Sequence, residues 1–211
     1  SIILFSSAIA YLLGSINTSI IVSKIAGKSD IRNFGSGNAG ATNTLRVLGK
    51  GAAIAVVIGD ALKGILAVLI ARLAFDFFSV SGDVRIPQYY AALFAVVGHI
   101  FPIYFGFRGG KGVLSAISAI FTLDWRTGCV LLAVFIIIVA ITRYVSLGSC
   151  IASSLYGFGT LAFVYFMDGD PAGIVCTFIS FFTAALVIFM HRGNIKRLAT
   201  HTEKKLGEKA K

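Results

Sequence analysis

Seven apolar segments, separated by short polar stretches, dominate this 211-residue sequence. Lipid offers no hydrogen-bond partners, so only helices and closed barrels satisfy their backbone in a bilayer. The segments lack the alternation of apolar and polar residues that barrel strands show. We therefore expect an all-α integral membrane protein with seven transmembrane helices in a single polytopic domain, residues 1–211. The segments are Ile3–Ile25, Gly51–Phe75, Gln88–Tyr104, Val113–Leu123, Thr127–Ile141, Ser149–Phe166 and Ala172–Met190.

Composition agrees with a membrane location. Hydrophobic residues make up 57% of the chain and charged residues 13%, the latter about half the fraction in an average soluble domain. The first apolar segment has no basic stretch before it, so we expect a membrane helix and not a cleavable signal. The fourth is short for a bilayer of about 30 Å. We expect its helix to begin earlier, at Gly109 or Gly110, inside the protein.

Basic residues set the expected orientation. Fifteen of the 19 Lys and Arg residues fall in the tail and in the first, third and fifth connections, whereas the opposite side holds only Arg85 and Arg126. The positive-inside rule then places the N-terminus outside and the C-terminus in the cytoplasm. Membrane orientation, together with contacts to anionic lipid or an anionic substrate, explains the net charge of +10. We therefore expect no nucleic-acid partner. The polar motifs would share the cytoplasmic face, in loops at about 26–50, 99–112 and 143–149 and in the tail 191–211.

The longest polar run, Asn33–Arg46, reads NFGSGNAGATNTLR. Its glycines allow a ligand to approach the backbone closely, and its Ser, Thr and Asn side chains add short hydrogen-bond donors. Such a loop leading into a helix is typical of an anion-binding site; a flexible linker is the alternative. Residues 35–40 also match G-x-G-x-x-G, but a dinucleotide site needs a preceding β-strand, and the polar connector before this run does not provide one.

The second motif loop surrounds Lys111 with three glycines. We expect the N–H groups of Gly109, Gly110 and Gly112 to be exposed at a helix start, where the helix dipole adds positive potential. The alternative is that Lys111 only contributes to membrane orientation. The loop is not a Walker A motif, because Gly112 follows the lysine instead of Ser or Thr. Two functions remain open for the aromatic side chains nearby, interfacial anchoring or an acyl-chain groove; these are Phe101, Tyr104, Phe105 and Phe107.

Carboxylates are scarce near these motifs. The second and third loops contain none, the first contains only Asp30, and the tail contains Glu203 and Glu208. Mg²⁺ prefers carboxylate oxygens and Zn²⁺ clustered His or Cys, and the three cysteines show no CxxC pairing. We therefore expect no metal, no other cofactor and no disulfide. Basic and hydroxyl side chains would instead hold one or two phosphate groups.

Groups able to transfer protons are equally few. No motif serine has the His and carboxylate neighbours of a covalent nucleophile. His191, at the end of the last apolar segment, is the better candidate for a substrate contact or a base, whereas His99 is expected to make a structural hydrogen bond. Asp60 and Lys63 share one helix face inside the second segment. We favour an ion pair that stabilises the bundle over a substrate role for these two residues.

Four stretches together resemble the bacterial acyl-phosphate:glycerol-3-phosphate acyltransferases, the PlsY family. Their sequences are GSGNAGATNTLR, GHIFPIYFGFRGGKG, RYVSLGS and HRGNIKRL. They match the family's four cytoplasmic motifs in order and spacing, over about Asn33 to Glu203, with no departure in the motif cores. Four motifs in this arrangement are far more specific than any single one.

The resemblance implies an enzyme that transfers a fatty acyl group from acyl phosphate to the sn-1 hydroxyl of glycerol 3-phosphate. The products would be lysophosphatidic acid and phosphate, in phospholipid biosynthesis at the bacterial cell membrane, with no acyl-enzyme intermediate. His191 or the substrate phosphate would act as base. Acyl phosphate would be bound by Ser36, Gly37, Asn38, Gly40, Thr42 and Asn43. Glycerol 3-phosphate would be bound by Arg46, Lys111, Ser149, His191 and Asn194.

A transporter for an organic phosphate is the rival class, because basic residues and broken helices around a cavity would suit one. Two features argue against it. The polar groups cluster on one face instead of at the midplane, and the sequence shows no internal repeat. A scaffold protein would not explain four separate motifs.

Overall fold

The computed structural model describes residues 1–208, and this part of the chain is helical with no strand. Most of the helices correspond to the apolar segments of the sequence. In order, they are α1 (Ile2–Gly14), α2 (Thr18–Ile25), η1 (Ile31–Asn33), α3 (Ala41–Leu48), α4 (Lys50–Phe77), α5 (Arg85–Ile100), η2 (Ile103–Phe105), α6 (Val113–Leu123), α7 (Trp125–Thr142), α8 (Val145–Ser154), α9 (Tyr156–Thr160), the π-helical η3 (Leu161–Met167), α10 (Gly173–Met190) and α11 (Arg192–Ala199).

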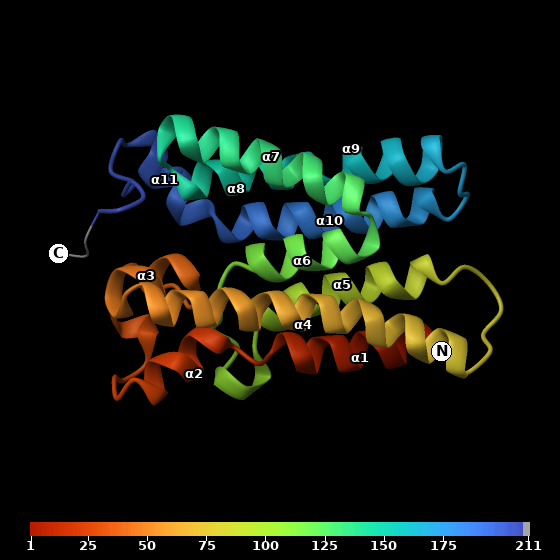
Figure 1. Ribbon diagram of the computed structural model, residues 1–211, viewed down its shortest axis with the longest axis horizontal. Helices are drawn as coiled ribbons and strands as arrows, with labels where there is room; N and C mark the ends of the chain where they lie inside the picture. Colours follow the sequence, from red (N-terminus) through yellow and green to blue (C-terminus); the bar gives the residue numbers. More distant parts are fainter. Residues whose placement is uncertain (209–211) are drawn as a thin grey trace.

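The long helices form two groups that run along one axis (Figure 1). One group contains α1, α2, α4 and α5, and the other contains α7 to α10; the short helix α6 lies between them and packs on α4, α5 and α7. The polar helices α3 and α11 lie together at one end, and Ser1 lies towards the other. The motif loops therefore meet at a single end of the bundle, between the two groups.

Six helical stretches are long and apolar enough to cross a membrane. They are Ile2–Ile25, Lys50–Phe77, Arg85–Phe105, Trp125–Thr142, Val145–Met167 and Gly173–Met190. The seventh expected span, α6, has 11 residues and is only about 16 Å long, roughly half the thickness of the hydrocarbon core.

The expectation that α6 begins at Gly109 or Gly110 is wrong. Gly109 donates its N–H to the carbonyl of Ile100 (2.9 Å), and Gly110 donates to that of His99 (3.1 Å). These bonds fold the chain back against the end of α5, and α6 starts only at Val113. Its start consequently lies inside the protein, well short of the end that carries α3 and α11 (Figure 1).

Small residues pack the first helices closely together. Five fully or almost fully buried alanines form one cluster between α1, α4 and α5, namely Ala10, Ala67, Ala71, Ala91 and Ala95. Close approach of small side chains is the usual way for helices to associate in lipid, where burial of apolar surface gives little driving force. This half of the bundle is thus a tightly packed support for the first motif loop.

The buried ion pair is confirmed. The ammonium of Lys63 lies 2.9 Å from the Asp60 carboxylate, and the two side chains are 5% and 1% exposed. Pairing removes the large cost of an isolated charge within the bilayer.

The end opposite the motifs carries an ion-pair network that the sequence analysis did not foresee. Arg126 forms two 2.8 Å contacts with Asp168 and a third with Asp124. Arg85 adds a 2.7 Å contact with Asp170. These pairs join the starts of α5 and α7 to the connection before α10.

Several aromatic side chains of the second loop face outward. Phe101, Tyr104 and Phe107 are exposed, and they line neither of the two cavities described below. Their positions favour interfacial anchoring over an acyl-chain groove. The cysteines, Cys129, Cys150 and Cys176, are all free, so the expectation of no disulfide is confirmed.

Candidate active site

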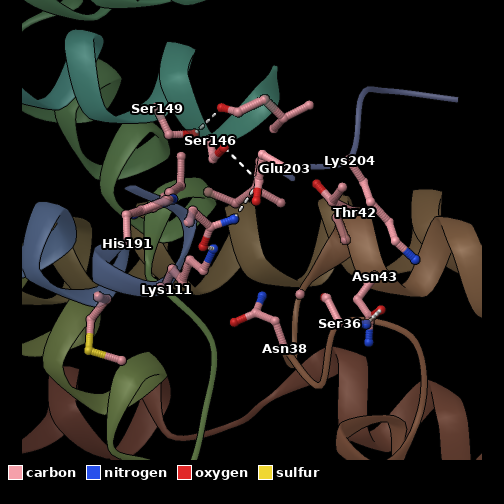
Figure 2. A pocket seen from close by; sticks show the side chains of 18 of the residues that line it. Ser36, Asn38, Thr42, Asn43, Lys111, Ser146, Ser149, His191, Glu203 and Lys204 are labelled. Atoms are coloured by element: carbon pink, nitrogen blue, oxygen red, sulfur yellow. Dashed lines mark hydrogen bonds between the residues drawn. The ribbon is translucent and has the colours of Figure 1, made fainter. Parts of the chain in front are cut away.

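A cavity of about 910 Å³ opens at the end of the bundle where the motifs meet. Residues of all four polar stretches line it. Figure 2 shows Ser36 and Thr42 on one side of this space and Lys111 and His191 on the other. The cavity brings together all the site residues expected from the sequence, which are Ser36, Gly37, Asn38, Gly40, Thr42, Asn43, Arg46, Lys111, Ser149, His191 and Asn194.

The first loop is shaped by two glycines and one asparagine. Gly35 and Gly37 have φ values of 62° and 71°, a backbone conformation that residues with a Cβ atom rarely adopt. The Asn43 amide accepts a hydrogen bond from the Ser36 N–H (2.8 Å) and donates to the carbonyl of Phe34 (3.0 Å). Asn43 is 1% exposed, so its amide holds the loop in shape although it borders the cavity.

The start of α3 remains open to an anion. Gly40 is its N-cap and offers no side-chain hydrogen bond. Within residues 1–208, the N–H groups of Asn38, Ala41 and Thr42 also make no hydrogen bond. Free N–H groups at a helix start attract negative charge.

Gly109 and Gly110 have a different role from the expected one, whereas Gly112 is the N-cap of α6 as expected. The N–H groups of Gly109 and Gly110 already donate to carbonyls of α5. A Cβ on Gly110 would overlap both the His99 ring and the Ala39 carbonyl oxygen. Gly110 therefore allows the two motif loops to approach each other, and Gly109 allows the second loop to lie against the end of α5. Neither glycine presents its N–H group to a ligand.

Lys111 projects from this junction into the cavity. Its ammonium donates to Oδ1 of Asn194, whose amide nitrogen donates to Glu203 (2.6 Å). Burial lowers the pKa of Lys111 to about 8, although the nearby Glu203 carboxylate favours the charged form. The lysine is thus a poorly solvated cation whose three donor hydrogens are not all used by the protein.

His191 is held as a neutral hydrogen-bond acceptor. Its Nδ1 lies 2.8 Å from the carbonyl oxygen of Val187, and a carbonyl only accepts, so Nδ1 carries the hydrogen. Burial, together with the charge of Lys111, lowers the pKa of His191 to about 4. Nε2 is therefore unprotonated at neutral pH and can accept a hydrogen bond from a hydroxyl group.

The third motif contributes two buried serines. Ser149 donates its hydroxyl to the carbonyl of Val145 (2.9 Å), and Ser146 donates to Glu203 (2.7 Å). Neither serine has a histidine partner within the described residues. The arrangement lacks the general base that a serine nucleophile requires.

The comparisons with known proteins agree with this geometry. The family model for glycerol-3-phosphate acyltransferases matches residues 4–201. The chain belongs to the glycerol-3-phosphate acyltransferase family. A relative of that name from Clostridioides difficile is 44% identical over 96% of this chain and 95% of its own length. Another from Thermoanaerobacter pseudethanolicus is 41% identical over 97% of this chain and 96% of its own.

Two crystal structures of PlsY (YgiH), an integral membrane glycerol 3-phosphate acyltransferase, are also similar. The glycerol 3-phosphate form has a TM-score of 0.82 and 36% identity, over 98% of this chain and 96% of that one. The lysophosphatidic acid form has a TM-score of 0.79 and 34% identity, with the same coverage. This acyltransferase is therefore an integral membrane enzyme of the same fold.

Glu203 is a cavity residue of this acyltransferase that the sequence analysis did not single out. Burial disfavours its charged form, but hydrogen bonds from Asn194, Ser146 and Arg197 more than compensate and lower its pKa. The carboxylate joins the third motif to the tail, as Figure 2 shows for Ser146. From the sequence, a carboxylate in a tail rich in Lys is expected to be a solvent-exposed charge. Its partners become apparent only in the structure, where the tail folds back over the cavity.

The cavity of the acyltransferase is predominantly basic. Asp60 and Glu203 are the only carboxylates among its described lining residues, and both contact cations. No group of three His, Cys, Asp or Glu side chains within residues 1–208 is arranged to hold a metal ion. The cations that line the cavity are Arg46, Lys111, Arg192, Arg197 and Lys204.

Proposed function

We propose that this acyltransferase uses acyl phosphate as its donor and the sn-1 hydroxyl of glycerol 3-phosphate as its acceptor, giving lysophosphatidic acid and phosphate. The observation that carries the proposal is a basic cavity beside an apolar one. The second cavity, of about 130 Å³, lies between α6, α7, α8 and α10. It shares Val113, Leu114, Phe135 and Ser149 with the large cavity. A phosphate head group and an attached acyl chain fit such a pair of neighbouring sites.

Glycerol 3-phosphate would occupy the side of the cavity that contains Lys111, Arg46, Ser149, His191 and Asn194. Lys111 supplies a desolvated cation to the phosphate, where charge-assisted hydrogen bonds are strongest. Asn194 currently binds that cation through Oδ1, so it holds Lys111 in place for the phosphate. His191 accepts the hydrogen bond of a glycerol hydroxyl through Nε2.

The phosphate of acyl phosphate would lie at the start of α3, with Ser36, Gly37, Asn38, Gly40 and Thr42. Free N–H groups and the helix dipole stabilise negative charge there. Asn43 supports the loop from behind. The leaving phosphate gains charge as its bond to the acyl carbon breaks, and donors already in place stabilise it without reorganisation.

The reaction is a direct displacement. The acceptor hydroxyl oxygen attacks the carbonyl carbon of acyl phosphate, and the bond from that carbon to the phosphate oxygen breaks. The hydroxyl proton passes to the released phosphate, either directly or through Nε2 of His191. With a pKa of about 4, His191 is the weaker base, because the departing phosphate keeps the electron pair of the broken bond and so gains negative charge. His191 therefore mainly orients the hydroxyl.

Ser36 serves as a phosphate donor in this scheme and not as a nucleophile. Ser36→Ala should lower kcat/KM for acyl phosphate about 10- to 150-fold, the value of one hydrogen bond to a charged group. Labelled acyl phosphate incubated with the wild-type protein alone should leave no covalent label after denaturation. A stoichiometric acyl adduct on Ser36, Ser146 or Ser149 would overturn direct attack.

The pKa of Lys111 predicts a pH dependence. A lysine with a pKa of about 8 loses its charge as pH rises through 8, while the phosphate monoester is already dianionic. The value of kcat/KM for glycerol 3-phosphate reports the free enzyme and should fall about tenfold per pH unit above 8. Lys111→Arg keeps its charge throughout this range and should flatten the profile. A wild-type profile that stays level to pH 9.5 contradicts the role of Lys111.

Donor choice tests the proposal directly. Purified enzyme is given glycerol 3-phosphate with acyl phosphate, acyl-CoA or acyl carrier protein, in excess EDTA. We expect equal amounts of lysophosphatidic acid and phosphate from acyl phosphate alone. Exclusive use of a thioester contradicts the donor, and activity that EDTA removes and Mg²⁺ restores contradicts a metal-free site.

The site is also proposed to face the cytoplasm of a bacterial cell, as the asymmetry of basic residues indicates. Thr200, exposed just after α11, is a suitable reporter. A single cysteine there, in a background without the native cysteines, should resist a membrane-impermeant reagent in intact cells. Ready labelling from outside would invert the topology.

A further inference from the structure

Three buried polar groups meet below the cavity, where α4 lies beside α5. Lys63 lies 2.9 Å from Oδ1 of Asp60 and 2.8 Å from Nδ1 of His99. It also donates to the carbonyl of Ile16 (3.0 Å). All three charged or polar side chains are at least 95% buried. Such a cluster is more than the single ion pair needed to neutralise Asp60.

The ammonium of Lys63 fixes the tautomer of His99. An ammonium has only donor hydrogens and no acceptor. Lys63 makes hydrogen-bond contacts with Ile16 and His99 and an ionic contact with Asp60, whose Oδ1 lies 3.7 Å from Nδ1 of His99. Nδ1 of His99 must therefore accept, so the hydrogen of the neutral ring is on Nε2. This is the reverse of His191, whose hydrogen is on Nδ1.

Nε2 of His99 points towards the junction of the two motif loops. A Cβ on Gly110 would overlap Nε2 and the Ala39 carbonyl oxygen, so the imidazole lies against both loops. His99 is 3% exposed and lines the large cavity. Nε2 makes no hydrogen bond to any residue within 1–208. Because His99 lines the cavity, Nε2 is available to donate a hydrogen bond to a ligand bound there.

We propose that His99 is a further catalytic residue, whose Nε2–H donates to an oxygen of acyl phosphate. His99 lies against the loop assigned to that substrate, because a Cβ on Gly110 would overlap both the His99 ring and the carbonyl oxygen of Ala39, which lies between Asn38 and Gly40. Lys63 and Asp60 are positioning residues that keep the hydrogen on Nε2. The inference rests on acyl phosphate being the donor.

Two substitutions separate this role from a structural one. In His99→Gln the side-chain amide nitrogen replaces Nε2, and the contact with Lys63 is lost. In His99→Asn the side-chain oxygen replaces Nδ1 as the partner of Lys63, and the donor to the cavity is lost. Each variant is compared with the wild type for kcat/KM, for its unfolding midpoint and for the stabilisation given by glycerol 3-phosphate.

The expected result is a loss of kcat/KM for acyl phosphate of about 10- to 150-fold in His99→Asn, with a smaller loss in His99→Gln. Stabilisation by glycerol 3-phosphate should persist in both. Activity of His99→Asn equal to or above that of His99→Gln overturns the proposal, because it shows that the contact with Lys63 is what matters. Turnover of acyl phosphate by the wild-type enzyme tests whether acyl phosphate is the donor. The role of His99 is tested only by the ratio of kcat/KM between the two variants.

A measurement on the wild-type protein covers the case in which a variant does not fold. The chain has three histidines, so ¹⁵N-histidine NMR resolves His99 from His191 and His201. His99 should show hydrogen on Nε2, and that resonance should shift when a non-hydrolysable acyl phosphonate is added. Hydrogen on Nδ1, or a resonance that the phosphonate leaves unchanged, contradicts the proposal.

Discussion

Replacing Lys111 by alanine is expected to lower kcat/KM for glycerol 3-phosphate about 30- to 150-fold, or about 2–3 kcal/mol. The lysine is a partly buried cation of the cavity, and burial lowers its pKa to about 8 because it removes part of its hydration. A bound phosphate would replace that lost hydration. Truncation of Lys111 also removes the hydrogen bond that it donates to Oδ1 of Asn194. Part of the fall in kcat/KM would therefore come from poorer positioning of the tail.

Lys196→Ala is the matched control for this experiment. Lys196 is exposed on α11 and does not line the cavity, so its removal changes the net charge equally without touching the site. We expect its kinetics to stay within about twofold of wild type, as for surface charges in general. Near-normal kcat/KM in Lys111→Ala, or an equal loss in Lys196→Ala, would show that the cavity lysine has no specific role.

Gly110→Ala is expected to cost about 1–3 kcal/mol of stability through overpacking and on the order of 100-fold in activity through displacement of the site. The new methyl group would overlap the Ala39 carbonyl and the His99 ring. Backbone movement is restricted because the Gly110 N–H donates to the carbonyl of His99. The two motif loops must therefore separate, which moves Lys111 away from the start of α3.

Gly51→Ala provides the comparison. Gly51 lies in the first turn of α4, and nothing lies within 4 Å of a Cβ built there. Alanine should be neutral or slightly stabilising at this helical position. Thermal unfolding and kcat/KM measured on both variants test the prediction. Wild-type activity in Gly110→Ala would show that the loops do not need their close contact.

The fold was largely predictable because lipid allows few solutions. Long apolar segments in a bilayer must be helices, and the six longest are helical and long enough to span it. The start of α6 was not predictable. Composition places Gly109 to Gly112 at a helix start, but hydrogen bonds from Gly109 and Gly110 to the end of α5 keep this stretch out of the helix, which begins at Val113. Those bonds depend on a return of the chain that no local pattern encodes.

The candidate site was predictable as a set of residues, since each motif combines glycine, hydroxyl and basic side chains. The contacts of those residues were not. Asn43 looks like a ligand but holds its own loop, and Glu203 looks like a solvated charge but joins Ser146, Asn194 and Arg197. We infer opposite tautomers for His99 and His191 from their contacts with Lys63 and Val187, which lie outside the motifs.

The initial-rate pattern tests the central claim, that one cavity holds both substrates for a direct transfer. Rates are measured at several fixed concentrations of glycerol 3-phosphate while acyl phosphate is varied. A ternary complex in a single cavity predicts double-reciprocal lines that intersect. Parallel lines, the pattern of a ping-pong enzyme with an acylated intermediate, would contradict the account.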